Sequence, residues 1–418
     1  MRCTKCRRNI ISRQFVLERE RNCLDCFLNR KLLAGGKHGC PGKRTAGDIR
    51  LFVVGPASVD EKGLTEVQIQ IMKVKLPISW PITETYQHSS FSVSIICAHD
   101  NIKNAYENNY INLLCYDTDN LWEMNLNFTD IFWTDFQRGD IFEINEFSVD
   151  NFLSNSISSF WRERIDQGNY LLLHTVDEYY LPYASSYHNR HLIHDTYIYG
   201  YEDDSFWIMA YTERKLKEIK VSSSDMAQSV FPSKEYMKEA CFWSLRPNKT
   251  IKVEIDYKKI KHYFYEYLGN NCSTRESMEN NQNKFKIRSN YRAGYVYGNR
   301  IYDVLINCLI KFMESSENSI SLDLRPFRLL WEHKRIIEGR IKLIIAKYNL
   351  HSDALLDFEN IVRLSNQIFI LCLKYTVTMK KDILERVVGK IKELKVREEM
   401  LLSNFLSMWE KRDLDSVC

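Results

Sequence analysis

The chain has 418 residues, 44% of them hydrophobic and 27% charged, which is enough for a sizeable core and for two or three domains. Its 15 glycines and 8 prolines are too few for a fibrous or disordered chain. No apolar run approaches the roughly 18 residues of a membrane-spanning helix. The start Met1–Cys6 lacks the apolar core of a signal peptide, so we expect a cytoplasmic protein without a membrane segment.

The formal net charge is +4, and it is unevenly placed. Residues 1–50 carry 13 Lys and Arg against 4 Asp and Glu, a balance of +9, so the remainder has a balance of −5. A basic head on a mildly acidic body indicates an anionic partner for the head, although a solvated surface of a small domain would look the same.

The head also holds a cysteine motif. Five of the twelve cysteines fall in the first forty residues, and Cys3-x-x-Cys6 and Cys23-x-x-Cys26 are separated by sixteen residues. Two Cys-x-x-Cys turns can supply four thiolates to one tetrahedral ion, at a spacing typical of zinc ribbons. We predict a structural zinc in a module spanning residues 1–45, with His38 and Cys40 as alternative ligands. Reduced thiols in a disordered head are the other interpretation.

Next in chain order come a β-rich region and a helix. Alternating apolar residues predict strands at Ile49–Val54 and Val67–Val74. Pro77 and Pro81 predict an extended segment from Leu76 to Tyr86, and Ser90–Cys97 is apolar enough for a buried helix, begun by the pair Ser89 and Ser90 as a cap.

The middle of the chain mixes both element types. We predict a helix over Asp150–Ile165, strands over Tyr170–Thr175, Phe206–Tyr211 and Thr250–Tyr257, and a helix over Lys258–Leu268. These elements make residues 46–290 an α+β domain.

A polar stretch from Gly269 to Asn290 predicts a loop or linker, and residues 291–418 form a predicted helical domain. One helix begins near Leu324, with Asp323 as a possible cap and a proline in its first turn. Adjacent Glu332 and His333 on this helix are expected at the surface or between helices. Three further helices are predicted over Asp353–Thr376, Met379–Lys392 and Val396–Met408.

The most informative motif lies between the two central strands. Val176–Pro182 reads Val-Asp-Glu-Tyr-Tyr-Leu-Pro, and after it come His191–His194 and the Gly-Tyr-acid turn of Ile198–Glu202. A histidine that enters a strand can be held there as a general base, with an acid from a neighbouring element to orient it. His194 is our candidate base, and His191 and His188 are its competitors. A structural histidine is the alternative.

These motifs resemble the papain-like N-terminal domain of the butirosin-biosynthesis protein H family of bacterial natural-product gene clusters, and more remotely the double-glycine leader peptidases. The resemblance covers Pro77 to Val221. It implies a papain-like fold and a nucleophilic cysteine at the start of the first core helix. This chain has no cysteine in Tyr86–Phe91, so either Ser89 or Ser90 replaces the thiol or the site is not nucleophilic.

The strand Phe206–Tyr211 lacks the acid that this family often carries there, so Asp177, Asp195 or Asp203 would orient the imidazole instead. Tyr179 and Tyr180, at the end of a strand, are expected to face the substrate together with His88. A satisfied turn whose tyrosines cap the core is the alternative. The zinc module separately resembles the amino-terminal module of eukaryotic transfer-RNA thiolation proteins, but only to about residue 35.

The sequence therefore predicts an α+β, papain-like protein with an N-terminal zinc knuckle and a C-terminal helical domain. Its expected function is acyl or aminoacyl transfer from a carrier-protein thioester, or amide cleavage, in natural-product biosynthesis. Two other classes stay open: a non-catalytic scaffold that has lost the nucleophile, and a nucleic-acid-binding protein led by the basic zinc module.

Overall fold

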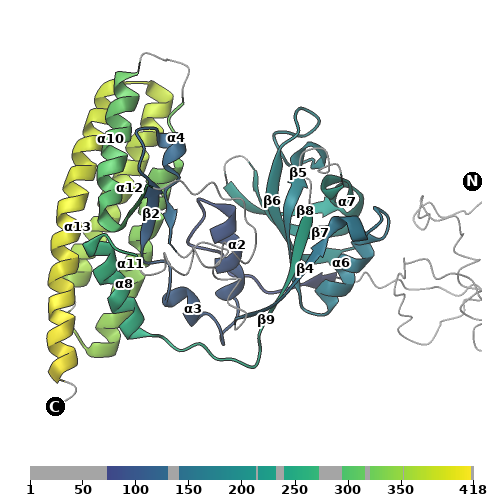
Figure 1. Ribbon diagram of the computed structural model, residues 1–418, viewed down its shortest axis with the longest axis horizontal. Helices are drawn as coiled ribbons and strands as arrows, with labels where there is room; N and C mark the ends of the chain where they lie inside the picture. The colour runs from purple at the N-terminus through teal and green to yellow at the C-terminus, as the bar shows by residue number, and fades with distance from the viewer. Residues whose placement is uncertain are drawn as a thin grey trace, which may run out of the picture. The chain divides into compact units, whose positions relative to one another are not determined.

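The computed structural model describes residues 73–129, 141–212, 215–231, 240–272, 294–315, 321–351 and 353–415. All of them belong to one compact unit, residues 49–418. The fold of this unit is mixed, with one antiparallel sheet, a smaller sheet and several long helices (Figure 1). The four cysteines of the predicted zinc site and the predicted strand Ile49–Val54 lie outside the described residues.

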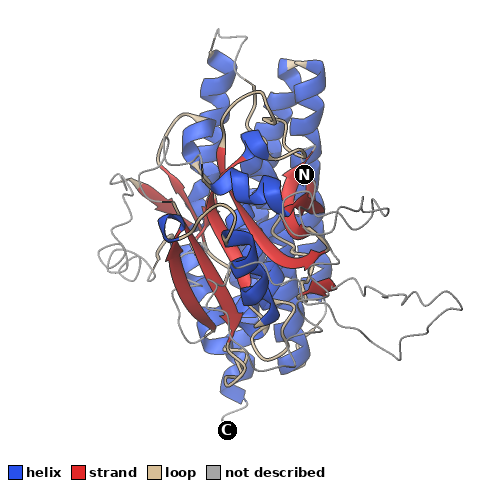
Figure 2. Ribbon diagram, turned by 90° about the vertical axis from the view of Figure 1, so that its right-hand side faces the viewer, coloured by secondary structure: helices blue, strands red, loops and turns tan. Residues whose placement is uncertain are grey.

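The main sheet has the strand order β4-β9-β5-β6-β7-β8, with β1 paired to β6, and every pairing is antiparallel. Figure 2 shows these strands side by side. Two predicted strands are confirmed as β5 and β7. The strands are β1 (Lys73–Lys75), β4 (Phe142–Ser148), β5 (Tyr170–Asp177), β6 (Ile193–Glu202), β7 (Ser205–Thr212), β8 (Lys215–Ser222) and β9 (Cys241–Pro247).

Both faces of this sheet are covered by helices (Figure 1). Helix α2 (Gln87–Ile96) contacts β6 and β7 on one face, where the Ser94 Oγ and the Tyr197 hydroxyl are 2.8 Å apart. Helices α6 (Ile157–Asp166) and α7 (Ser223–Val230) pack on the other face around Leu173 and Ile198. Strand residues alternate between these two cores because successive side chains point to opposite faces.

The predicted strand over Thr250–Tyr257 is wrong, although its alternation is real. Ile251, Val253 and Ile255 pack against the core, but the segment pairs with no strand, and α8 (Tyr257–Gly269) begins at its end. Side-chain amides from 101–108 bind its carbonyl groups instead: Asn101 to Ile251, Asn104 to Val253 and Asn108 to Glu254. These amides satisfy the backbone as a partner strand would.

The predicted domain boundary at residue 290 separates strands that pair with each other in the smaller sheet. Strand β10 (Tyr295–Tyr297) pairs with β2 (Leu113–Tyr116), which also pairs with β3 (Asn127–Phe128). The remaining elements are α3 (Asn104–Glu107), α4 (Leu121–Met124), η2 (Val149–Asn151), η3 (Glu178–Tyr180), η5 (Gly298–Arg300), α10 (Ile301–Glu314), α11 (Arg325–Tyr348), α12 (Asp353–Thr378) and α13 (Lys381–Asp415).

Helix α13 replaces two of the predicted helices. Buried Ile391, Leu394, Glu398 and Leu402 keep helical spacing across the expected break, so the chain continues as one helix. Within the described part of the chain, no helix is long and apolar enough to cross a membrane.

Candidate functional site at the start of helix α2

The predicted nucleophile position lies at the start of α2, on the sheet face that this helix covers. Ser89 and Ser90 are both fully buried. Ser90 Oγ lies 2.6 Å from the Thr83 carbonyl oxygen and 2.8 Å from that of Tyr86. The prediction that this serine pair caps the helix is wrong: Tyr86 is the N-cap residue, and its side chain makes no capping hydrogen bond. The first N–H groups of an α-helix have no acceptor within the helix itself.

Four buried side-chain oxygens near this helix start have no hydrogen-bond partner within the described structure: Thr83 Oγ1, Thr85 Oγ1, Gln87 Oε1 and Ser89 Oγ. Thr83, Gln87 and Ser89 are at least nine-tenths buried. Buried polar atoms are almost always paired, so four unpaired ones within seven residues make this segment a candidate for binding a polar group. The Tyr211 hydroxyl of β7 lies beside Ser90.

The segment before α2 is tied to α11 by charged groups. The Glu332 carboxylate, 1% exposed, accepts a hydrogen bond of 3.1 Å from the Thr85 N–H and pairs with Arg328 at 3.0 Å. Arg328 also pairs with Glu84, and Glu84 accepts from the Trp80 indole. Of the two expected places for Glu332, the surface is wrong, because its side chain is buried in a contact between α11 and the segment that leads into α2. Burial raises the pKa of Glu332 to about 7, against the lowering effect of Arg328.

A second ion pair lies at the start of α11. Arg325 binds the Asp323 carboxylate at 2.8 Å, and its guanidinium lies over the rings of Tyr86 and Trp122 at 5.9 and 5.2 Å. The Trp122 side chain is half exposed. Two arginines and exposed aromatic surface thus lie near the start of α2.

The structure does not bring His194 to either serine. His194 pairs across the sheet with Val176, which packs in the core under α6 and α7. Cross-strand partners point to the same face, so His194 lies on the face opposite α2. Its Nδ1 is 2.8 Å from Glu178. Burial lowers the pKa of His194, but the hydrogen bond and charge of Glu178 outweigh it and raise the pKa above its usual value.

Asp177 orients His191 rather than His194. Its carboxylate is fully buried, lies 2.6 Å from His191 Nδ1 and accepts from the N–H groups of Tyr179 and Leu192. The Tyr179 ring stacks on His191 at 4.4 Å and contacts the Tyr180 ring at 5.0 Å. These contacts fix the loop after β5, while the His88 side chain lies outside the described structure.

On the α2 face the sheet carries a different histidine, which the sequence analysis missed. His174 of β5 lies 3.6 Å from Asp195 of β6 and packs edge-on against Trp243 at 4.5 Å. The available signal was the alternation of β6, which places Asp195 on the same face as Tyr197.

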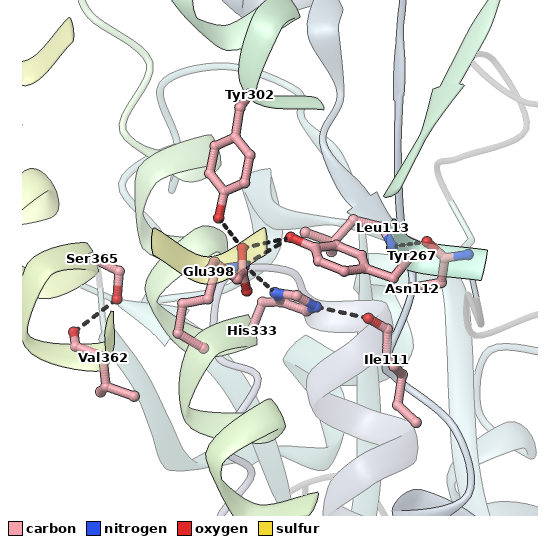
Figure 3. Close-up of polar contacts among 10 residues, drawn as sticks. Ile111, Asn112, Leu113, Tyr267, Tyr302, His333, Val362, Ser365 and Glu398 are labelled. Atoms are coloured by element: carbon pink, nitrogen blue, oxygen red, sulfur yellow. Dashed lines mark hydrogen bonds and ion pairs between the residues drawn. The ribbon is translucent and has the colours of Figure 1, made fainter. Parts of the chain in front are cut away.

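A second polar cluster lies in the helical part, and Figure 3 shows it. Lys334 on α11 points its ammonium group at three acceptors: Glu398 at 2.6 Å, the Tyr267 hydroxyl at 2.9 Å and His333 Nδ1 at 2.9 Å. An ammonium group has three N–H donors, so it is fully satisfied. Burial lowers the pKa of Lys334 to about 8, against the charge of Glu398.

The rest of this cluster is satisfied as well. The second oxygen of Glu398 accepts from the hydroxyls of Tyr267 and Tyr302 at 2.9 and 2.5 Å, and His333 Nε2 lies 2.7 Å from the Ile111 carbonyl oxygen. Burial lowers the pKa of His333 well below its usual value, so the ring is neutral and donates through Nε2. This buried network joins α8, α10, α11 and α13, and each of its charged groups has hydrogen-bond partners within it.

No known protein-family profile matches this sequence, and a search of curated proteins finds no significant relative. Within the described residues, no group of three or more His, Cys, Asp or Glu side chains is placed to hold a metal ion. The start of α2 is therefore the candidate site on its geometry alone.

Proposed function

We propose that this chain is an accessory protein of natural-product biosynthesis that binds, at the start of α2, the acyl or aminoacyl group of a carrier-protein thioester. In this proposal the sheet and α2 form a papain-like unit, as the resemblance over Pro77–Val221 implies. The observation that carries the proposal is the set of unpaired, buried oxygens of Thr83, Gln87 and Ser89 at the start of a helix whose N-cap side chain makes no capping hydrogen bond.

The chemistry of this place suits a carbonyl group. A carbonyl oxygen can accept from N–H groups of the first turn of a helix, which have no acceptor within the helix and lie at the positive end of the helix dipole. The unpaired hydroxyls of Thr83 and Ser89 can each donate one hydrogen bond or accept one.

The geometry favours binding over an acyl-enzyme. Ser89 and Ser90 are fully buried, and the candidate base His194 lies on the other face of the sheet. A serine hydroxyl without a base within hydrogen-bonding distance is a poor nucleophile. We therefore propose the scaffold form of this function, in which the protein holds the thioester for a partner enzyme.

Acetyl-pantetheine is a suitable probe. We expect saturable binding in saturation-transfer NMR and no mass increase of the intact protein after long incubation. Ser89→Ala and Thr83→Val should weaken binding at least several-fold, whereas Ser407→Ala, on the exposed surface of α13, should not. An acetyl adduct on Ser89 or Ser90 would establish an acyl-enzyme instead, and absence of binding would refute the proposal.

The +9 charge of residues 1–50 favours a second candidate, nucleic-acid binding by the zinc module. Each phosphate contact releases counterions, so affinity should fall steeply and log-linearly with salt concentration. Fluorescence-anisotropy titrations with a single-stranded RNA at several salt concentrations test this. Binding that is unchanged in a variant without residues 1–45 would refute it.

A further inference from the structure

Glu332 connects two parts of the chain that lie far apart in sequence. Its side chain starts on α11, yet one carboxylate oxygen accepts the Thr85 N–H, 247 residues away, one residue before the N-cap of α2. The other oxygen accepts from Arg328. With 1% of the side chain exposed, water does not compete for either bond.

The charges around Glu332 do not balance when it is ionised. Glu332 pairs with Arg328 on the same helix, and Arg328 also pairs with Glu84 in the segment before α2. Two carboxylates then depend on one guanidinium group. The neighbouring Arg325 is itself paired with Asp323.

Two tyrosines among the described residues also interact with Glu332, Tyr86 before α2 and Tyr211 on β7. Burial raises the pKa of both well above neutrality, so neither gains or loses a proton near pH 7. The proton that changes the charge of this cluster near neutral pH is therefore the one on Glu332, whose pKa is raised to about 7.

We propose that Glu332 is a positioning residue: its ionised carboxylate holds the Thr85 backbone, and with it the start of α2, in the form that binds ligand. Hydrogen bonds to an ionised acceptor are roughly twice as strong as those to a neutral one, so protonation weakens this hold. The ligand part of this inference rests on the proposed function, whereas the contact with Thr85 does not.

The raised pKa of Glu332 also makes the stability of the fold depend on pH. The pKa of Glu332 is higher in the folded state than its ordinary 4.5, so the folded state binds the proton more tightly than the unfolded state. The stabilising contribution is complete below pH 4.5 and is lost as the pH rises through about 7. Above about pH 7, ionised Glu332 therefore holds the Thr85 backbone most firmly, although in this pH range it contributes least to the stability of the fold.

NMR of protein labelled with ¹⁵N-threonine tests the contact directly. The Thr85 amide signal, assigned through its loss in Thr85→Ser, should titrate in one step with a midpoint near pH 7. In Glu332→Gln the same signal should stay flat, and in the control Glu314→Gln, an exposed partner of Lys311, it should titrate as in the wild type. A flat signal in the wild type, or an unchanged titration in Glu332→Gln, would overturn the inference.

Arg328→Gln gives an independent check if Glu332→Gln does not fold. Loss of the guanidinium should move the Thr85 midpoint to higher pH, and an unmoved midpoint would overturn the inference. Acetyl-pantetheine affinity should rise at least several-fold from about pH 5.5 to 8.5 in the wild type and stay constant in Glu332→Gln. A titrating Thr85 signal with pH-independent affinity overturns the ligand part alone. No binding at any pH refutes the proposed function and leaves the Thr85 result standing.

Discussion

The buried pair Lys334–Glu398 should contribute far more to folding than a surface ion pair, and Lys334→Met tests this. Met fills a similar volume but leaves the Glu398 carboxylate, 1% exposed, without its cation. Removal of one partner from a buried ion pair typically costs about 3–5 kcal/mol, because the other charge stays buried and uncompensated. We expect a loss of this size in the free energy of unfolding at pH 7.

Glu398→Gln should cost a similar amount for a different reason. Without the charge and hydrogen bond of Glu398, burial alone acts on Lys334, so its pKa should fall further and the neutral form should be favoured. A lysine with the ordinary pKa of 10.5 must be deprotonated at pH 7, and each unit between pKa and pH costs about 1.4 kcal/mol. The free-energy cost is therefore at most about 5 kcal/mol. In the double variant Lys334→Met with Glu398→Gln no charge remains, so its cost should be at least about 2 kcal/mol less than the sum of the single costs.

Urea denaturation followed by far-UV circular dichroism measures all three variants. The control is Glu338→Gln with Lys342→Met on the same helix, an exposed pair whose coupling should be only about 0.3–0.5 kcal/mol. If the coupling of Lys334 with Glu398 is no larger than that of this control pair, the reasoning from burial and complete hydrogen bonding is refuted.

Three further predictions concern separate parts of the chain. Gly298→Ala should cost at least about 2 kcal/mol in thermal or urea melts, because Gly298 has a φ of +62° and a Cβ there would collide with a backbone carbonyl of α8. Gly339 lies inside α11, and a Cβ there would meet nothing within 4 Å, so Gly339→Ala should be neutral or stabilising. Equal changes in stability for Gly298→Ala and Gly339→Ala would contradict this reasoning. His194→Ala should leave acetyl-pantetheine binding intact and cost less than about 1 kcal/mol, since the side chain is 47% exposed. The contribution of His194 to stability is present below a pH near 6.5 and is lost at higher pH, because the fold raises the pKa of His194. If His194→Ala abolished binding but left the melting curve unchanged, His194 would belong to the site. Purified protein should contain about one zinc per chain, and the double change of Cys3 and Cys6 to Ser should remove it, as metal analysis will show.

Local patterns in the sequence were sufficient for many elements. The alternation that predicted β5 and β7, and the periodicity that predicted α8 and α12, depend only on neighbouring residues. The same signals were misleading where side chains replaced a partner, as the asparagines do along residues 251–256. The zinc module and the papain-like assignment remain predictions.

Only the tertiary structure decided the site. Period-two alternation says which strand residues share a face, but not which helix covers that face, so the sequence could not show that His194 lies opposite α2. Likewise, nothing local to Glu332 or Lys334 indicates that their partners are Thr85 and Glu398, which are 247 and 64 residues away. Burial and long-range pairing set the charge and pKa of these groups, and both depend on how α11 packs against the rest of the chain.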